Sequence, residues 1–567
     1  MKRKPLRRLA WTGAIFFLLL FSLCLIYYLM TRIEPPTLSD HSAEVLVVNK
    51  AGPTFFYCKD NWLKKSESGL WEMFIQGEPY ERGVINGKLS ANLIYRQEKA
   101  FIDRISEMVP SRFYQHFLKY FIYWFNRNLD KYVTEEYKLE IYGISRSASD
   151  DFSFIGNKYR RLLNYHSAHD IGHALKDLQL VGCTSFGVWN DLSTDSSLII
   201  GRNFDFYAGD EFAKNKIVCF EKPEKGYAFM MVTWGGMIGT VSGMNIKGLT
   251  VTINAAKSEI PFSARTPISI LAREILQYAK TIPEAFKIAR QRQTFVSESI
   301  LIGSGDENKA AIIEKAPFGI SLFVPSDNYV ICTNHFQSSL FRNDLLNKKT
   351  RREDASVYRF NRVFQLLRQK QPLDPVRTAG ILRNPYGLSD KDIGFGNEKA
   401  VNQFIAHHSI IFKPGKRLVW ISTSPYQLGP YVCYDLCKIF NTFAGLQEKT
   451  EMTEPDMIIP ADPFLKTDSY KQFLRYRGMR KVIIKVISMT NPVLLNHTFF
   501  KEYEASNPGY YEVYSLSGDY WMKVGDMSAA IRSYKLALDR TIPRLPERNE
   551  IIAKLAGCLA QRKNEKK

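Results

Sequence analysis

The residues best suited to chemistry lie between Gly182 and Asp205. Cys183 follows a glycine, and a polar stretch leads from it to an apolar run that ends in GRNFD, the motif that contains Arg202. A strand, a turn and a second strand would place the charged side chains of this motif, Arg202 and Asp205, beside the cysteine. A thiol flanked by a fixed cation and a fixed carboxylate suits nucleophilic catalysis. A lone cysteine is more commonly a buried core residue, so this interpretation depends on motifs elsewhere in the chain.

The segment that must position Cys183 has the texture of a β-rich domain. From residue 180 to about residue 440, short apolar runs alternate with Gly, Asn and Asp turns, which predicts strands. Helical patterns interrupt these strands near residues 267–292 and 355–370. Strands in two sheets with helices outside them predict a layered α/β sandwich.

Further motifs on both sides of Cys183 indicate a family. Upstream, GEPYERG at residues 77–83 precedes GKL at residues 87–89. The downstream motifs, in chain order, are SGMNIKGLTVTINA at 242–255, CTNHF at 332–336, YRFNRV at 358–363 and HHSIIFKPGKRLVWISTSPYQLGPYVCYDL at 407–436. About residues 70–440 resemble the self-processing cysteine hydrolases of the N-terminal-nucleophile superfamily. The resemblance is to the acyl-coenzyme A:6-aminopenicillanic acid acyltransferase (isopenicillin N acyltransferase-like) family, with penicillin V acylase and bile salt hydrolase as more distant relatives.

The resemblance implies an α+β fold, the four-layer αββα sandwich of that superfamily, and self-cleavage between Gly182 and Cys183. The Cys183 thiolate would attack the Gly182 carbonyl, and hydrolysis of the ester-like intermediate would free the α-amino group of Cys183. That amine has an ordinary pKa of about 7.7–8, which suits a general base. Asp205 would orient the amine and Arg202 would favour the thiolate. One residue then supplies nucleophile and base, and no catalytic histidine, cofactor or metal is implied.

Three more residues receive roles from the resemblance. Asn254 matches the family's oxyanion donor, whose side-chain N–H stabilises charge on a tetrahedral intermediate. Asn334 matches a second asparagine that orients the nucleophile and its oxyanion. Arg359 matches an arginine of the more distant acylases, and Arg362, one helical turn away, is the alternative counterpart.

Each of these residues also has an ordinary structural explanation. The two asparagines are typical of turns at strand ends, the charges of GRNFD could form a structural pair, and Arg359 could lie on a solvated helix face. Their joint occurrence in family order favours catalysis. The histidines His335, His407 and His408 have no spacing or partner typical of a metal site. We expect them to be packed or surface residues.

The N-terminus combines a basic flank with an apolar stretch. Residues 10–30 are uncharged and apolar, long enough to cross a bilayer as a helix. A cleaved signal peptide would have a shorter apolar core and a small-residue cleavage site. The basic flank predicts a single-pass anchor with a cytoplasmic N-terminus and an exported, periplasmic or extracytoplasmic catalytic domain.

Two regions outside the β-rich segment have helical patterns. Aromatic residues crowd residues 111–137 at helical spacing. Core packing is the favoured interpretation of that face, and an acyl-chain channel or a membrane-surface contact is the alternative. Residues 441–567 lie outside the resemblance, and GDYWMKVGDMSAAIRSYKLAL at 518–538 has the spacing of one tetratricopeptide-like hairpin. One repeat cannot bury its own apolar face, so it should pack on the catalytic domain or cap a short array.

Composition narrows the possible partners. The formal net charge is +20, from 77 Lys and Arg against 57 Asp and Glu. Basic residues are spread along the chain without a nucleic-acid motif, which favours a surface near anionic lipid over nucleic-acid binding. The eight cysteines lack zinc spacing, and apart from Cys183 we expect them to be core residues.

These patterns predict four segments: a cytoplasmic basic flank and membrane anchor at 1–33, a propeptide or small-subunit region at 34–182, the catalytic domain at 183–440 and a helical extension at 441–567. The leading hypothesis is a membrane-anchored, self-cleaving cysteine amidohydrolase or acyltransferase. It would act on a small-molecule, non-peptide linear acyl amide through an acyl-Cys183 thioester, and its two cleaved chains would stay associated. The alternative is a non-catalytic anchored scaffold whose helical tail binds a partner. A peptidase acting on other proteins is a third hypothesis.

Overall fold

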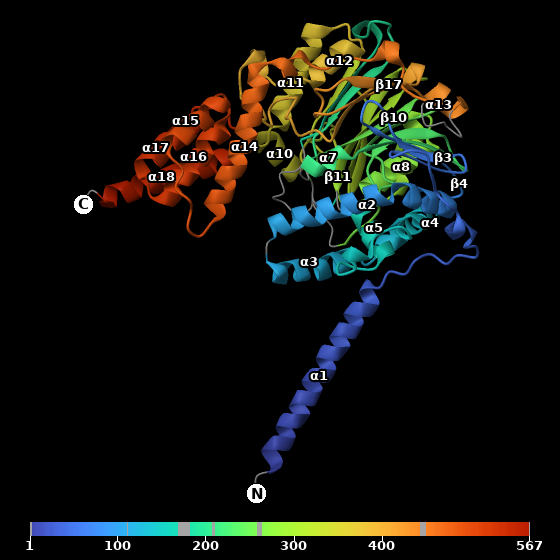
Figure 1. Cartoon of the computed structure of the whole chain (residues 1–567), viewed down its shortest axis with the longest axis horizontal. Coiled ribbons are helices and arrows are strands. Elements are labelled where there is room, and N and C mark those ends of the chain that lie inside the picture. The colour runs from blue at the N-terminus through green and yellow to red at the C-terminus, as the bar shows by residue number, and fades with distance from the viewer. Residues whose placement is uncertain are drawn as a thin grey trace.

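Two antiparallel-rich sheets form the centre of the protein in the computed structural model, which describes residues 3–109, 111–167, 170, 182–206, 210–257, 263–442 and 450–565 (Figure 1). The larger sheet has 11 strands in the order β1-β2-β3-β4-β7-β8-β9-β10-β11-β12-β13, and the smaller has six in the order β14-β5-β6-β15-β16-β17. The strands of the larger sheet are β1 Asn49–Lys50, β2 Phe55–Cys58, β3 Asn61–Lys65, β4 Trp71–Gly77, β7 Ile217–Pro223, β8 Phe229–Thr233, β9 Ser242–Asn245, β10 Leu249–Ala256, β11 Ser297–Ser304, β12 Lys309–Ala316 and β13 Gly319–Phe323. Those of the smaller sheet are β14 Tyr329–Cys332, β5 Thr184–Val188, β6 Ile199–Phe204, β15 His408–Lys413, β16 Leu418–Ser422 and β17 Tyr431–Asp435.

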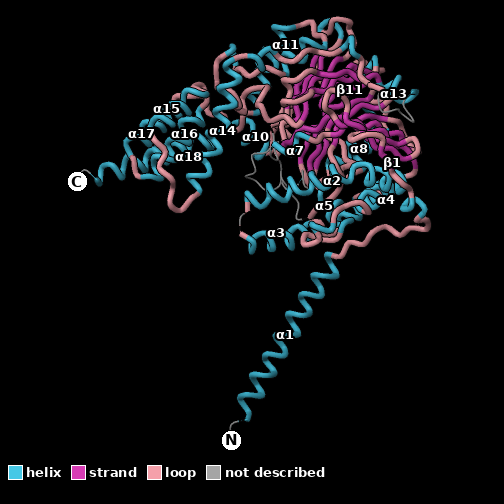
Figure 2. Tube along the Cα trace, in the orientation of Figure 1, coloured by secondary structure: helices cyan, strands magenta, loops and turns pink. Residues whose placement is uncertain are grey.

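The helices lie around and beside the sheets (Figure 2). Those before Cys183 are α1 Arg3–Thr31, α2 Pro79–Met108, α3 Arg112–Phe125, α4 Glu135–Ser145 and α5 Lys158–His166. Those between the strands and just after them are α7 Asp210–Lys214, α8 Ile268–Tyr278, α9 Ile282–Gln291, α10 Leu345–Glu353, α11 Ser356–Lys370, α12 Pro375–Leu382 and α13 Leu436–Thr442. Those of the C-terminal part are α14 Asp468–Ser488, α15 His497–Ser506, α16 Tyr511–Val524, α17 Met527–Leu538 and α18 Leu545–Glu565. The helical stretches predicted near 267–292 and 355–370 are α8, α9 and α11.

Alternating side chains on each strand build three apolar cores. In β7, Val218 and Phe220 face a core shared with Ile410 of the smaller sheet, so the two sheets pack face to face. The intervening Ile217 and Cys219 belong to a core that includes α2, α4, α8 and α9. The outer face of the smaller sheet packs on α11 and α12. Helices therefore cover the outer face of each sheet, and the fold is mixed α+β with a helical C-terminal part.

The segment before Cys183 supplies strands that the sequence patterns did not predict. β1 to β4 continue the larger sheet, and β4 pairs in parallel with β7, with Glu72 opposite Val218. This part of the predicted propeptide is thus one flank of the same sheet that holds β10. The last stretch of the predicted propeptide, residues 171–181, lies outside the described residues.

Two motif glycines let α2 and α4 approach closely. A Cβ on Gly83 would stand 2.1 Å from the backbone oxygen of Glu140, and one on Gly87 would stand 2.8 Å from that of Ile144. On the facing helix, a Cβ on Gly143 would stand 2.5 Å from the backbone oxygen of Tyr80. Both the end of GEPYERG and the start of GKL are explained by this contact between backbones.

Most aromatic residues of α3 are exposed, so the core packing favoured for residues 111–137 is wrong for them, although Phe125 and Tyr137 do lie in the core. Phe113 is 77% exposed and Phe117 is 65% exposed. The pattern is amphipathic as predicted, but solvent rather than the core meets its apolar side. The exposed aromatic residues of α3 are Phe113, Tyr114, Phe117, Tyr120, Phe121 and Trp124.

Helix α1 projects from the rest of the molecule, and the C-terminal end of α1 meets α3 (Figure 1). The stretch Trp11–Thr31 has a mean hydropathy of 2.4 and is long and apolar enough to cross a membrane, by length and composition alone. The Tyr27 hydroxyl donates to the backbone oxygen of Tyr120 at 2.7 Å, and their rings meet edge to face. The apolar helix and the exposed aromatic face are therefore neighbours.

The C-terminal helices α14 to α18 pack around a core of their own. α16 and α17 form a hairpin over the predicted 518–538 stretch, and Gly525, at φ +87°, makes its turn. The bundle docks on the β-rich region where Phe404 meets Phe473 of α14, with ring centroids 4.6 Å apart.

Two cysteines depart from the expected core position. Cys24, on α1, and Cys437, on α13, are exposed, whereas Cys183 and Cys332 are buried. All eight cysteines are free thiols.

Candidate active site

Cys183 immediately precedes β5, and Arg202 lies on the neighbouring strand β6. The two strands pair antiparallel, with Ser185 opposite Arg202, as the local sequence predicts. The pairing sets Nη2 of Arg202 3.8 Å from Sγ of Cys183, with both residues fully buried. The cation and the thiol are therefore in direct contact.

Backbone carbonyls just before β9 and on β10 fix the Arg202 guanidinium. Its Nη1 donates to the oxygen of Val241 at 3.0 Å and to Oγ of Ser242, and its Nη2 donates to the oxygen of Ile253 at 2.5 Å. An arginine held by its rigid fork of donors has little freedom to move. The larger sheet thus orients a cation that the smaller sheet carries.

Asp205 closes the other side of the site just after β6. Its backbone oxygen accepts from the N–H of Gly182 at 3.0 Å, and its Oδ2 accepts from Nε2 of Gln403 at 3.4 Å. Burial raises the pKa of Asp205 to about 7, although Arg359 and Arg202 oppose the rise. Its buried Oδ1 has no hydrogen-bond partner among the described residues. Asp205 is therefore a carboxyl group with acceptor capacity to spare.

Gln403 is a site residue that sequence reasoning missed. It is buried, and its Nε2 donates to the backbone oxygen of Gly182 at 2.7 Å. It comes from an irregular loop more than 200 residues beyond Cys183, with no motif around it to signal a role.

Asn254, on β10, links three strands beside Cys183. Its Nδ2 donates to the backbone oxygen of Cys332 at 3.0 Å, and its Oδ1 accepts from the hydroxyl of Ser185 at 2.8 Å. Ser185 is two residues after the cysteine on β5. The predicted oxyanion donor therefore lies at the site, with its amide also bonded to the protein in the uncut chain.

Asn334 and Arg359 form a hydrogen-bonded pair at the same edge. Nη2 of Arg359 donates to Oδ1 of Asn334, whose Nδ2 donates to the backbone oxygen of Ala255 at 3.0 Å. Arg359 acts electrostatically on both Cys183 and Asp205. It is buried rather than on a solvated helix face.

The alternative counterpart, Arg362, faces away from this group. It bonds with Asp390, Asn384 and Gln365. Of the two arginines that the sequence offered as counterparts, Arg359 therefore bonds to the site residue Asn334, whereas Arg362 bonds to other residues.

The surroundings hold Cys183 in its neutral form. Burial raises the pKa of its thiol to about 12, with Arg202 and Arg359 opposing the rise and Asp205 and Glu298 adding to it. A thiolate nucleophile therefore requires a proton acceptor or a change of environment before it can attack.

A second pair of carboxyl groups lies near the site and was also missed. Glu298, on β11, is opposite Ala255 of β10, and Asp170 accepts from the N–H of Ile268 at 2.8 Å. Burial raises the pKa of both carboxyls well above the ordinary values. Asp170 comes from the segment before Cys183, so that segment reaches the neighbourhood of the site.

The three histidines are packed residues, as expected. Nε2 of His408 is 2.8 Å from the hydroxyl of Ser242, and its Nδ1 is 2.9 Å from Nδ1 of His407. His335 is hydrogen bonded to Thr333. Within the described part of the chain, no group of three or more His, Cys, Asp and Glu residues could hold a metal ion.

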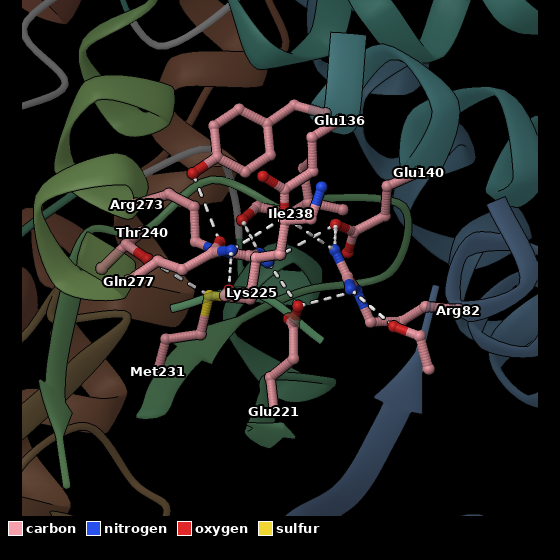
Figure 3. Close-up of polar contacts among 12 residues, drawn as sticks. Arg82, Glu136, Glu140, Glu221, Lys225, Met231, Ile238, Thr240, Arg273 and Gln277 are labelled. Atoms are coloured by element: carbon pink, nitrogen blue, oxygen red, sulfur yellow. Dashed lines mark hydrogen bonds and ion pairs between the residues drawn. The ribbon is translucent and has the colours of Figure 1, made fainter. Parts of the chain in front are cut away.

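A buried ionic cluster joins the segment before Cys183 to the segment after it (Figure 3). Arg82 of GEPYERG contacts Glu140 of α4 at 2.6 Å and Glu221 of β7 at 2.8 Å. Arg273 of α8 contacts the same two carboxylates from the other side. All four side chains are 0–1% exposed. Glu136 of α4 lies a further 3.7 Å from Arg82, so two arginines and three carboxyl groups meet across the predicted cleavage boundary.

A family of known proteins matches the part of the chain that contains most of these site residues. Residues 192–422 match the sequence model of a family described as "Acyl-coenzyme A:6-aminopenicillanic acid acyl-transferase". The match begins after Cys183, and it includes the site residues Arg202, Asp205, Asn254, Asn334 and Arg359.

Two curated proteins are similar over less than half of this chain. An uncharacterized protein of Archaeoglobus fulgidus is 24% identical over 263 residues, which are 44% of this chain and 44% of that protein. Protein dcd1B of Dictyostelium discoideum is 20% identical over 261 residues, 43% of this chain and 49% of that protein. The chain spans about half the length of these relatives.

One similar solved structure is that of an N-acylethanolamine-hydrolyzing acid amidase ortholog of Caenorhabditis elegans. It is 17% identical in sequence and has a TM-score of 0.32, and the match covers 41% of this chain and 93% of that one. A mutant conjugated bile acid hydrolase of Clostridium perfringens is 11% identical, also with a TM-score of 0.32, covering 48% and 95%. Likeness this weak carries no functional weight. The family match does carry weight: residues 192–422 form a domain of the acyl-coenzyme A:6-aminopenicillanic acid acyl-transferase family.

Proposed function

We propose that this protein is a self-cleaving cysteine amidohydrolase or acyltransferase whose nucleophile is Cys183. The observation that carries the proposal is the contact between the Cys183 thiol and the Arg202 guanidinium, 3.8 Å apart and enclosed by the partners of a nucleophilic site. The family match supports an amide hydrolase or acyltransferase. The enclosing residues are Asp205, Asn254, Asn334 and Arg359.

Cleavage between Gly182 and Cys183 would give the neutral thiol a base for its attack on external amides. It frees an α-amino group, of ordinary pKa about 7.7–8, on the residue that carries the thiol, and this amine takes the thiol proton. The buried Oδ1 of Asp205, without a hydrogen-bond partner among the described residues, suits it to orient that amine. The site thus has an acceptor in place for a group that only cleavage creates.

Turnover would proceed through an acyl-Cys183 thioester. The thiolate attacks the carbonyl of a linear, non-peptide amide, and a side-chain N–H of Asn254 or Asn334 stabilises the developing oxyanion. The amine leaves, and water or an acceptor amine then attacks the thioester. Hydrolysis is favoured if the domain is exported, because acyl-coenzyme A is a cytoplasmic metabolite.

The layers support a four-layer αββα N-terminal-nucleophile fold, with residues 183–440 as catalytic domain. Residues 34–182 would then be the small subunit, and 441–567 a helical extension with one tetratricopeptide-like hairpin. The shared sheet and the Arg82 cluster support association of the two chains after cleavage.

We also propose that α1 anchors the protein with its N-terminus in the cytoplasm and the catalytic domain exported. The basic flank supports this orientation. The exposed aromatic face of α3, bonded to α1 through Tyr27, supports a position against the bilayer surface, because aromatic side chains favour the membrane interface.

Intact-mass measurement and N-terminal sequencing of the purified chain test the proposal. Wild type should give two chains, one beginning at Cys183, and Cys183→Ala should stay uncut. Cys332→Ala is the matched control, because it removes another buried thiol near the site and should still be cut. An uncut wild type would favour a non-catalytic scaffold. For the cut protein, a panel of N-acyl amino acids, β-lactams and bile-acid conjugates would then identify the acyl group.

A further inference from the structure

We propose that Gln403 is a catalytic residue of self-cleavage, whose side-chain amide stabilises the oxyanion formed at Gly182 when Cys183 attacks. The inference deepens the function proposed above and rests on it. Nε2 of Gln403 lies 2.7 Å from the oxygen that would take up the negative charge. The amide therefore already contacts this oxygen before attack, and a hydrogen bond to it becomes stronger as the oxygen gains negative charge.

The scissile peptide is held on both sides of Gly182. The N–H of Gly182 donates to the backbone oxygen of Asp205 at 3.0 Å, while its C=O accepts from Gln403. A residue bonded through both backbone groups presents one face of its carbonyl in a fixed direction. The reacting group is thus oriented before any chemistry begins, which removes part of the entropic cost of attack.

The scissile oxygen itself determines which end of the Gln403 amide meets it, because a backbone carbonyl oxygen can only accept a hydrogen bond. The same Nε2 also donates to Oδ2 of Asp205 at 3.4 Å. The nitrogen of the amide therefore points toward Gly182 and its oxygen points away. Gln403 is pre-organised as a donor, as stabilisation of a developing charge requires.

The loop that carries Gln403 is fixed on each side of that residue. Before it, Asn402 donates from Nδ2 to the backbone oxygen of Arg383 at 3.2 Å. After it, Phe404 adopts φ 55°, a conformation that a bulky residue rarely takes unless its surroundings impose it. The Phe404 ring packs on Phe473 of α14. The C-terminal bundle, outside the family match, therefore supports the loop that positions the donor.

This contact also explains the glycine before the nucleophile. A Cβ on Gly182 would stand 2.5 Å from Oε1 and 2.7 Å from Nε2 of Gln403. Any larger residue would push the amide off the carbonyl oxygen. The requirement for glycine is thus a requirement of the donor.

Gln403 and the two asparagines Asn254 and Asn334 donate to different carbonyl oxygens. In the uncut chain, Asn254 donates to the oxygen of Cys332 and Asn334 donates to that of Ala255. The side-chain amide on the scissile oxygen is that of Gln403. We assign Gln403 to maturation and the asparagines to turnover of external amides.

The step balances without a co-reactant other than water. Sγ of Cys183 bonds to the Gly182 carbonyl carbon, its proton passes to the Cys183 nitrogen, and the carbon–nitrogen bond breaks to give a thioester and a free amine. Water then adds to the thioester and the carbon–sulfur bond breaks. The products are the Gly182 carboxylate, the Cys183 thiol and the protonated α-amino group. Gln403 donates a hydrogen bond in both additions and is unchanged.

The test is the first-order rate of self-cleavage of the newly synthesised full chain, followed by gel and intact mass. Gln403→Leu should cleave about 100-fold more slowly than wild type, the cost of losing one oxyanion donor. Gln427→Leu is the matched control: Gln427 is also fully buried, but its amide lies on the oxygen of Leu382. This control should cleave at the wild-type rate.

A second variant keeps the test independent of folding defects. In Gln403→Glu the new carboxyl can donate only when protonated, so its cleavage rate relative to wild type should rise as the pH falls from about 8 to about 5. A purely structural role would not produce this rescue. Gln403→Leu cleaving like wild type, or Gln403→Glu without rescue, overturns the inference while the proposed function stands. A wild-type chain that stays uncut while its fold is intact overturns both.

Discussion

At the scale of single residues, Asp205 shows how a buried carboxyl group can cost stability. Its carboxyl is fully buried, and burial raises its pKa from 3.8 to about 7 despite two nearby arginines. The fold therefore favours the neutral form, and ionisation at higher pH opposes folding. The backbone oxygen and Oδ2 of Asp205 each accept a hydrogen bond at the site, and the proposed function gives a reason for burying this carboxyl group there.

Asp205→Asn should therefore stabilise the uncut chain at high pH. Because the folded pKa is raised, the contribution of Asp205 to stability is fully present below about pH 4 and is lost as the pH rises through about 7. In a Cys183→Ala background, the gain from Asn should be near zero at about pH 4 and reach at most about 4 kcal/mol above pH 7. Unfolding curves across this range measure it. A gain that is the same at every pH would contradict the raised pKa.

Local chain geometry could predict only the contact made within a short hairpin, whereas Asn254, Asn334 and Arg359 were predicted through the family resemblance. Cys183 and Arg202 share neighbouring strands, so their contact follows from local chain geometry. Gln403 comes from a distant irregular loop, and no periodicity or motif signals its approach to Gly182. Glu298 reaches the site through strand register, which depends on which strands become neighbours.

At the scale of elements, α3 shows why its pattern misled. An apolar helix face has the same spacing whether it meets a protein core or a membrane interface. The sequence predicts the amphipathic helix, and the medium around it depends on where α3 lies in the fold. β1 to β4 were missed for a related reason, because short strands become recognisable only once a neighbouring strand pairs with them.

Trp124 of α3 tests the membrane contact. The fluorescence of Trp124 is the difference between the emission of wild type and that of Trp124→Phe. In nanodiscs made with brominated lipid this difference should be strongly quenched, because the ring would lie at the lipid interface. Trp420→Phe is the matched control, since Trp420 is buried and its fluorescence should be unaffected by bromine. Equal signals from Trp124 with and without brominated lipid would contradict the contact.

The buried cluster around Arg82 should be essential to the pairing of α2 and α4 with β7. Arg82→Met would leave Glu140 and Glu221 short of a cation, and breaking a buried ion pair costs about 3–5 kcal/mol. Lys99→Met is the control on the same helix, because the Lys99–Asp103 pair is exposed and worth under about 1 kcal/mol. Denaturant unfolding of the uncut Cys183→Ala chain compares the two. Equal effects would show that Arg82 has no special structural role.

At the scale of the whole molecule, the predicted cleavage boundary crosses a single body. Strands β1 to β4 belong to the segment before Cys183 and continue a sheet of the segment after it, and the ionic cluster takes residues from both segments. Without that first segment, residues 183–440 would lack strands β1 to β4 of the larger sheet.

The larger chain should therefore remain on membranes after cleavage although it lacks α1. Membranes bearing the cut protein, washed in high salt without denaturant, should retain both chains, because the buried sheet pairing between β4 and β7 is not screened by salt. Washing with urea should release the larger chain. Its appearance in the salt wash would contradict the predicted association.

The parallel pairing of β4 with β7 has a kinetic consequence. While the chain is continuous, the two strands find each other within one molecule, at a rate that does not depend on concentration. A cut between Gly182 and Cys183 would make the same pairing an encounter between two molecules, and refolding would become second order. Maturation would then be irreversible in two senses. The peptide bond between Gly182 and Cys183 is not remade. A mature protein that unfolds in a dilute membrane has also lost the covalent link that first brought β4 and β7 together.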